Sequence, residues 1–262
     1  DLGYDRRALE AAEAADRLAE EAGVSREERL RIRGQYQMTA GRWEEAVRSF
    51  SSLRDFFPEQ LEYGLRLATA QLAAGRPDQA LGTVEELRSL EPPASDDPRI
   101  DLKEADAAAS LGRWNRQLEA AGRAVAKGQA RNSRLLVAEA RLSEAGALMR
   151  LGRYPEAEAA AGAGLETARA VGDLSTVARC HQTLARISFA RRDLEAARGH
   201  FEEALRLRRE LGNRAGEAEA LNGLGGVAAQ AGDADAAMAR FEEALEVATD
   251  AGAHEEMARI LN

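Results

Sequence analysis

The sequence has few of the residues that build β-sheets. Among its 262 residues there are four isoleucines and nine valines, and aromatic residues make up 5%. Strands depend on β-branched and aromatic side chains, so a sheet is not expected. Alanine, leucine, glutamate and arginine are abundant instead, and these are strong helix formers. The composition therefore predicts an all-α fold.

Disulfides, long apolar runs and an excess of positive charge are also lacking. Cys180 is the single cysteine, which excludes an intrachain disulfide and gives no sign of an oxidising compartment. No apolar run approaches the roughly 20 residues that a membrane-spanning helix needs, and no signal peptide is visible. The net charge of −9 argues against a general binder of nucleic acids or anionic membranes, since both need a cationic surface. We therefore expect a cytoplasmic chain whose partners are neither nucleic acids nor membranes.

The sequence is internally repetitive. Gly172, Gly212 and Gly252 are evenly spaced, and the segment Phe-Glu-Glu-Ala-Leu at 201–205 recurs letter for letter at 241–245, at the same interval. Toward the N-terminus the interval between matching glycines becomes progressively shorter. A regular interval between matching residues indicates supersecondary units that stack on one another.

Each repeat has the pattern of a helical hairpin. An Ala- and Leu-rich stretch ends in a turn, such as Gly-Arg-Trp at 41–43 or Gly-Arg-Tyr at 152–154, and a second amphipathic stretch follows. The glycine can take the left-handed conformation that ends a helix. Small residues lie five and twelve positions after it, where closely packed helices leave no room for a larger side chain. All six prolines fall at expected helix starts or in connections.

These patterns predict a single repeat array over residues 1–262. Six full helix pairs are expected, at residues 25–58, 59–93, 96–132, 133–172, 173–212 and 213–252. Partial units are expected at 1–23 and 253–262, because the chain begins and stops within a repeat. We therefore expect a fragment of a longer protein, covalently linked to further domains.

Motifs that suggest catalysis or cofactor binding are better explained by the repeat. The run Gly-Leu-Gly-Gly-Val-Ala at 223–228 matches a dinucleotide fingerprint, but it is expected in mid-helix, without the strand that the fingerprint requires. His254 begins a segment like that of zinc proteases, but Ala258 stands where the second histidine is needed. Cys180 and His181 are adjacent, so on a helix they point about 100° apart. Cys180 is expected on the packing face, where it behaves as a small apolar residue. No catalytic, cofactor or metal site is expected, and the chain is not expected to be an enzyme.

The repeats resemble tetratricopeptide repeats, in the longer-helix form with roughly 40 residues per unit, a period typical of helical arrays. The residues that follow the family pattern best are Leu224-Gly225, Gly232, Ala237, Phe241 and Ala244. The sequence departs from the pattern at Glu104 and Glu144, where leucine is expected, and the helix register of the third and fourth units stays open. The resemblance implies a right-handed superhelical solenoid of antiparallel helix pairs, whose first helices line a concave groove.

By the same resemblance, the groove positions are the second, fifth, ninth and twelfth of each first helix. The candidate partner-binding residues at these positions are Arg31, Gln35, Leu65, Thr69, Leu72, Leu102, Leu142, Met149, Arg179, Gln182, Arg186 and Asn222. The apolar members favour a protein or peptide ligand. Arg179 and Arg186, seven residues apart on one helix face, could hold a carboxylate together with Gln182 and Asn222. Alternatively, the leucines belong to a deeper core, and the arginines are solvated charges paired with acidic neighbours.

Two functional hypotheses follow. The first is a scaffold that binds a partner protein or peptide segment in its groove. The second is the sensing arm of a larger bacterial signalling protein, such as a kinase, an ATPase or a transcription regulator. In such an arm a ligand or partner biases an attached output domain. The domains that flank this segment would discriminate between the two.

Overall fold

The chain is built from α-helices. The computed structural model describes residues 5–250, 257 and 260, without the side chains of 5–8, 20 and 21. Within these residues it contains thirteen α-helices, one short 3-10 helix and no strand. The prediction of an all-α fold is confirmed. Gly252, His254, Ala258 and most of the partial unit expected at 253–262 lie outside the described residues.

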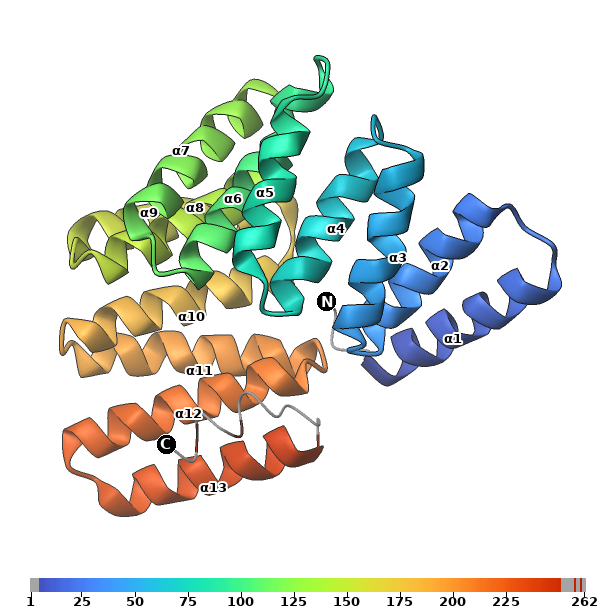
Figure 1. Cartoon of the computed structure of the whole chain (residues 1–262). Helices are drawn as coiled ribbons and strands as arrows, with labels where there is room; N and C mark the ends of the chain where they lie inside the picture. Colours follow the sequence, from blue (N-terminus) through green and yellow to red (C-terminus); the bar gives the residue numbers. More distant parts are fainter. Residues whose placement is uncertain (1–4, 251–256, 258–259, 261–262) are drawn as a thin grey trace. The chain divides into compact units, whose positions relative to one another are not determined.

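Within each of two compact units, successive helices run antiparallel, and most are joined by short turns (Figure 1). The helices are α1 (Asp5–Glu21), α2 (Arg26–Thr39), α3 (Trp43–Phe56), α4 (Leu61–Ala73), α5 (Pro77–Arg88), α6 (Pro98–Ser110), α7 (Trp114–Ala130), α8 (Arg134–Arg150), α9 (Tyr154–Val171), α10 (Leu174–Ala190), α11 (Leu194–Glu210), α12 (Arg214–Ala231) and α13 (Ala234–Asp250). A 3-10 turn, η1 (Ala94–Asp96), precedes α6. The chain divides into two compact units, residues 5–136 and the described residues from 137 onward. The grouping of all helices into a single array stays a prediction.

The turns between helices depend on a left-handed residue. Gly152 and Gly232, at φ 75° and 84°, end helices in the conformation that the sequence predicts for them. Arg192 lies midway between these two glycines in the sequence and has the same conformation, with φ 64°. A side chain with a Cβ is disfavoured there, by roughly 1–2 kcal/mol. The fifth hairpin therefore has a strained turn where its neighbours have glycine.

Replacing this arginine by glycine is expected to stabilise the chain. The variant Arg192→Gly should raise the free energy of unfolding by about 1 kcal/mol, because glycine adopts a positive φ without the steric penalty. Chemical denaturation monitored by circular dichroism measures the change. The matched substitution Gly152→Ala should lower the free energy by a similar amount. A loss of stability in Arg192→Gly would contradict this explanation of the turn.

Small residues let the helices approach closely, as the repeat pattern predicts. Ala46, Ala80, Ala157 and Ala197 are all completely buried. A Cβ added to Gly223 would lie 2.3 Å from the ring of Phe201, so this glycine leaves room for α11 to pack against α12. The glycine run at 223–228 lies within α12, with no strand before it. It is therefore a helix-packing site and not a dinucleotide fingerprint.

The prolines lie in the first turns of helices or in the connections between helices. Pro77 and Pro98 are the first residues of α5 and α6, and Pro155 lies in the first turn of α9. At these positions the missing N–H would have no partner within the helix. Pro58 and the pair at 92–93 lie in connections between helices. The predicted boundaries at these prolines are confirmed.

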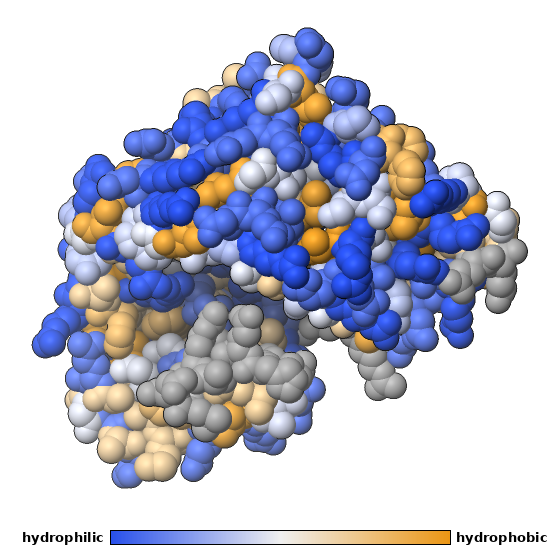
Figure 2. Space-filling view, in the orientation of Figure 1, coloured by the Kyte–Doolittle hydropathy of each residue, from blue (hydrophilic) through white to orange (hydrophobic). Residues whose placement is uncertain are grey.

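The surface in the view of Figure 2 is mostly hydrophilic, with apolar residues scattered across it.

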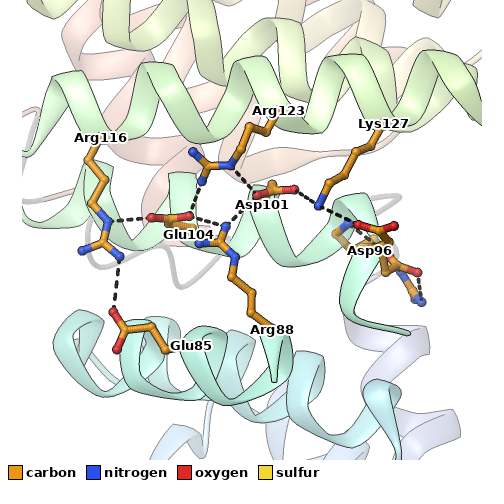
Figure 3. A network of polar contacts seen from close by, with 10 residues as sticks. Glu85, Arg88, Asp96, Asp101, Glu104, Arg116, Arg123 and Lys127 are labelled. Carbon is orange, nitrogen blue, oxygen red and sulfur yellow. Dashed lines mark hydrogen bonds and ion pairs between the residues drawn. The ribbon is translucent and has the colours of Figure 1, made fainter. Parts of the chain in front are cut away.

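Within residues 5–136, polar side chains also lie inside the fold (Figure 3). The carboxylates of Asp101 and Glu104 on α6 are only 1% and 5% exposed. Arg88 of α5 bridges them, with its Nη2 at 2.6 Å from Asp101 Oδ1 and 2.5 Å from Glu104 Oε2. Arg123 of α7 bridges the same two carboxylates from the other side, at 2.9 and 2.5 Å.

Two further cations complete this network. Lys127 Nζ lies 2.8 Å from Asp101 Oδ2, and Arg116 Nε donates to Glu104 Oε1 at 2.6 Å. Burial alone raises the pKa of each carboxyl, but the hydrogen bonds and positive charges around it outweigh burial and hold the pKa below its usual range. Glu104 is thus the departure from the repeat pattern that the sequence revealed. It replaces a leucine by an ion-paired carboxylate that connects α5, α6 and α7.

Candidate functional site

A hollow of about 670 Å³ lies along the first helices α10 and α12. Its lining residues are Arg150, Gln182, Arg186, Phe189, Phe201, Glu219, Asn222, Gly223 and Gly226. Six of them, spaced three or four apart along α10 and α12, are at the groove positions that the repeat pattern gives. This spacing puts them on one face of each helix. A volume of this size is typical of ligand-binding clefts in proteins.

Three of the predicted site residues meet in this hollow, and two have no partner of their own. Gln182 is only 8% exposed, yet its amide makes no hydrogen bond to a described residue. Arg186 is exposed and forms no ion pair within the described part of the chain. Neither polar atom of the Gln182 amide is fully shielded from solvent, so its hydrogen bonds are available to a ligand. Asn222 brings a second amide from α12.

The remaining lining residues give the hollow its mixed chemistry. Phe189 provides an apolar wall beside Gly226, where an added Cβ would be at an ordinary 3.7 Å from the ring. Arg150 and Glu219 add one positive and one negative charge. Glu219, Phe189 and Gly226 are at predicted groove positions. Arg150, at the end of α8, is not a groove position, and repeat counting gives no signal for it.

Arg179 is not part of the lining. Its Nη1 lies 3.5 Å from Glu139 Oε1 on α8, and both side chains are close to half exposed. This arrangement is the solvated pair with an acidic neighbour that the sequence left as an alternative. An exposed pair of this kind contributes little to stability, typically below about 1 kcal/mol.

The other predicted residues are distributed between core and surface. Leu65, Leu102 and Leu142 are buried, so they offer little surface to a partner. Leu72 and Met149 are half-buried. The last three of the predicted residues are the polar Arg31, Gln35 and Thr69. Arg31 and Gln35 are exposed, and Gln35 Oε1 accepts a hydrogen bond from Arg66 at 2.7 Å. The Thr69 hydroxyl donates to the Leu65 carbonyl at 2.9 Å.

A histidine pair lies on another face of α10. His181 Nδ1 is 3.1 Å from His200 Nδ1 on α11, and His181 Nε2 is 3.2 Å from Arg169 Nη2 on α9. Arginine can only donate, so His181 Nε2 accepts and its Nδ1 carries the proton donated to His200. Burial first, then the neighbouring His200 and Arg169, lower the pKa of His181 to about 4. Both rings are therefore neutral at pH 7.

Cys180 has the structural role that the sequence predicts. It is fully buried, and burial raises the pKa of its thiol to about 12. A thiol with such a pKa is not a nucleophile at neutral pH. Within the described residues, no group of three or more histidine, cysteine or acidic side chains could hold a metal ion. No described helix has the length and apolarity to cross a membrane.

A second hollow, of about 460 Å³, lies over α13. Its lining residues are Ala229, Gly232, Ala234, Ala237, Met238, Phe241, Glu242, Leu245 and Ile260. Figure 2 shows the apolar surface of this region at the lower edge of the view. With a single polar side chain, Glu242, it has few groups that could orient a peptide. The hollow along α10 and α12 is the better candidate site.

Comparison with known proteins identifies the fold. Sequence models of the tetratricopeptide repeat match residues 37–105, 136–210 and 178–250. A search of curated protein sequences finds no match. Similar solved structures include BtubC from P. vanneervenii, with 20% identity, a TM-score of 0.55 and coverage of 95% of this chain and 92% of that one.

Two further solved structures are similar. PilW, a type IV pilus biogenesis factor, has 18% identity and a TM-score of 0.64, over 87% of this chain and 95% of that one. A Rap protein complexed with competence and sporulation factor has 13% identity and a TM-score of 0.72, over 97% and 76%. At these identities the likeness concerns the fold. Because the repeat models cover most of the sequence and the helices pair as the repeat requires, the chain belongs to the tetratricopeptide repeat family.

Proposed function

We propose that the chain is a non-catalytic scaffold that binds an extended segment of a partner protein in the hollow along α10 and α12. Tetratricopeptide repeats are protein–protein interaction modules, and the hollow has the size and chemistry for such a segment. Two unpartnered groups in the hollow carry the proposal. Gln182 is buried and makes no hydrogen bond to a described residue, and Arg186 is exposed and forms no ion pair with a described residue. Both groups gain partners when a peptide binds.

Each lining group has a task in this proposal. The amides of Gln182 and Asn222 can each donate to and accept from the backbone of an extended peptide. Phe189 offers apolar contact to one of its side chains. Arg186 can pair with an acidic side chain, which suits a cationic group without a partner.

A ligand-sensing regulatory arm is the second candidate. It is supported by the fold shared with a Rap protein that is complexed with competence and sporulation factor. The same hollow would then hold the ligand, and binding would bias an attached domain in a cytoplasmic signalling protein. The test is whether a ligand of the hollow alters the activity of the domains that flank this segment in the full protein.

Reversal of one charge tests the scaffold proposal. A displayed library of random peptides is selected on the wild-type chain, and the dissociation constant of an enriched peptide is measured by calorimetry. The variant Arg186→Glu should bind this peptide at least tenfold more weakly, which corresponds to about 1.4 kcal/mol. The helical circular dichroism should be unchanged, since Arg186 is exposed.

Arg198→Glu is the matched control. Arg198 is exposed on α11 and does not line the hollow, and among the described residues its one ion pair is with Glu195, at 3.4 Å. Its reversal changes the net charge equally, so it should leave the affinity within twofold of wild type. Equal weakening by both variants would mean a general charge effect, and undiminished binding by Arg186→Glu would remove the hollow from the site.

A further inference from the structure

Arg208 is a buried cation without a partner among the described residues. It is 8% exposed, although it lies near the end of α11 between two arginines that are exposed. Arg206 pairs with Glu203 and Glu210, and Arg209 pairs with Glu217 and Glu243. Arg208 has neither a hydrogen bond nor an ion pair with any residue in the described part of the chain.

The side chain of Arg208 lies against the first turn of α12. A Cβ added to Gly216 would be 2.6 Å from Cδ and Nε of Arg208 and 3.0 Å from its Cζ. Gly216 therefore leaves the space through which the guanidinium reaches α12. The charged groups that act on it are Glu219 on α12 and Arg179 on α10, both at groove positions. Glu219 also lines the hollow, so Arg208 lies next to the end of the candidate site.

The side chain of Arg208 is largely buried, but its unpaired nitrogens keep some contact with solvent and are open to an anion. Burial, the largest effect, lowers the pKa of Arg208; Glu219 opposes that shift and Arg179 adds to it. A guanidinium nevertheless keeps its proton in proteins, so the charge remains. Buried charges in proteins are normally paired, because desolvation of an isolated ion is strongly unfavourable. An unpaired buried charge next to a ligand cleft therefore indicates that its partner anion belongs to the ligand.

We propose that Arg208 forms an anion subsite at the α12 N-terminal end of the hollow, which takes a carboxylate of the bound protein segment. The inference rests on the proposed function and names the chemistry of the ligand. Two sources supply this group, an acidic side chain or the C-terminal carboxylate of the segment. Arg208 donates the hydrogen bonds to it, while Gln182 and Arg186 hold the neighbouring residues of the same segment.

A titration with acetate tests the subsite without any peptide. The Nε–H signal of Arg208 is followed by NMR in the full chain while sodium acetate replaces sodium chloride at constant ionic strength. It should shift saturably with acetate, with a dissociation constant in the millimolar range, whereas chloride alone should cause no saturable shift. Disappearance of the signal in Arg208→Met assigns it. An identical response to both salts would overturn the subsite.

Two variants separate ligand binding from a structural role. Arg208→Met keeps the apolar stem that packs against Gly216 but removes the charge. It should melt at or above the wild-type temperature, because no hydrogen bond or ion pair within the described residues is lost, yet bind the selected peptide at least tenfold more weakly. The control Arg206→Met, on the exposed face of the same helix, should keep wild-type affinity. A lower melting temperature with full peptide affinity in Arg208→Met would make the arginine structural and overturn the proposal.

Peptide analogues distinguish the two sources of the carboxylate. Amidation of the C-terminus should abolish the difference between wild type and Arg208→Met if the terminal carboxylate is bound. Replacement of Asp or Glu by Asn or Gln should abolish it if a side chain is bound. Failure of both to reduce the difference would contradict the proposal. If wild type selects no peptide, the proposed function fails, while the acetate titration still decides whether the anion subsite exists.

Discussion

The double variant Arg88→Met/Arg123→Met is expected to lower the free energy of unfolding by about 2–3 kcal/mol, because it breaks a buried ion-pair network. These two arginines bridge the buried carboxylates of Asp101 and Glu104 from opposite sides (Figure 3). Their removal leaves two desolvated anions with one cation each, Lys127 and Arg116. Breaking a buried ion pair typically costs about 3–5 kcal/mol, and the two remaining cations reduce the loss. Urea denaturation at pH 7 measures it.

A third substitution identifies the origin of that loss. Glu104→Leu, added to the double variant, removes a stranded charge and restores the leucine of the repeat pattern. It should recover at least half of the lost stability, since apolar replacement of buried ion pairs is often neutral or favourable. The exposed pair of Arg153 with Glu156 is the control, and Arg153→Met should change stability very little. A further loss on adding Glu104→Leu would contradict this account of the network.

Acidification from pH 7 to pH 5 is expected to destabilise the chain by about 2 kcal/mol through the linkage between proton binding by His181 and folding. Its pKa is about 4 in the folded chain, against an ordinary value of 6.5. Above pH 6.5 both states hold the ring neutral, so the contribution to stability is complete. Between pH 6.5 and 4 the unfolded chain binds a proton that the folded chain does not, and stability falls with pH. The pKa of His200 is lowered too, chiefly by burial, and its effect has the same sign.

The hydrogen bonds explain why neither ring accepts the proton. A proton on His181 Nε2 would face the guanidinium of Arg169, and one on His200 Nδ1 would face the Nδ1–H of His181. Glu203 and Glu158 are the nearby acids, and Arg206 adds a further positive charge. Together they do not offset the effect of burial on either pKa.

His181→Leu tests this explanation. Leucine fits the position, because Leu221 occupies the equivalent place one repeat further along and is completely buried. Urea denaturation at pH 7 and at pH 5 should give a difference in the variant that is less than half of the wild-type difference. An equal fall in both chains would assign the acid sensitivity to other groups.

The hairpin architecture can be predicted from the sequence because its signals are local. A positive φ needs glycine, a first helical turn tolerates proline, and a close helix contact needs alanine. Each requirement recurs at a regular interval, as at Gly152 and Gly232. The predicted role of Cys180 is equally local, because a cysteine among small apolar residues on a packing face is buried.

The candidate site can be predicted only in part, because it depends on side-chain paths between repeats. Counting along α10 and α12 finds Gln182, Arg186 and Asn222. The same counting also names leucines such as Leu65, which turn into the core where helix register is set by packing. Arg208 gives no signal in the sequence, since other arginines flank it and only the space left by Gly216 determines which of them is buried.

The sequence shows that Glu104 departs from the repeat pattern, but it does not predict the ion pairs that Glu104 forms. The three arginines that pair with it come from two other helices, α5 and α7. Their convergence on one carboxylate depends on how these helices pack, and repeat counting along α6 carries no information about it.

Photo-crosslinking from Phe189 tests the central proposal most directly. A photoreactive phenylalanine analogue replaces Phe189 in the hollow along α10 and α12, and a second chain carries it at Met238 in the apolar hollow over α13. Each is irradiated with the selected peptide. We expect a covalent adduct with the peptide from position 189 and none from position 238. An adduct from position 238 alone would contradict it and move the binding site to the other hollow.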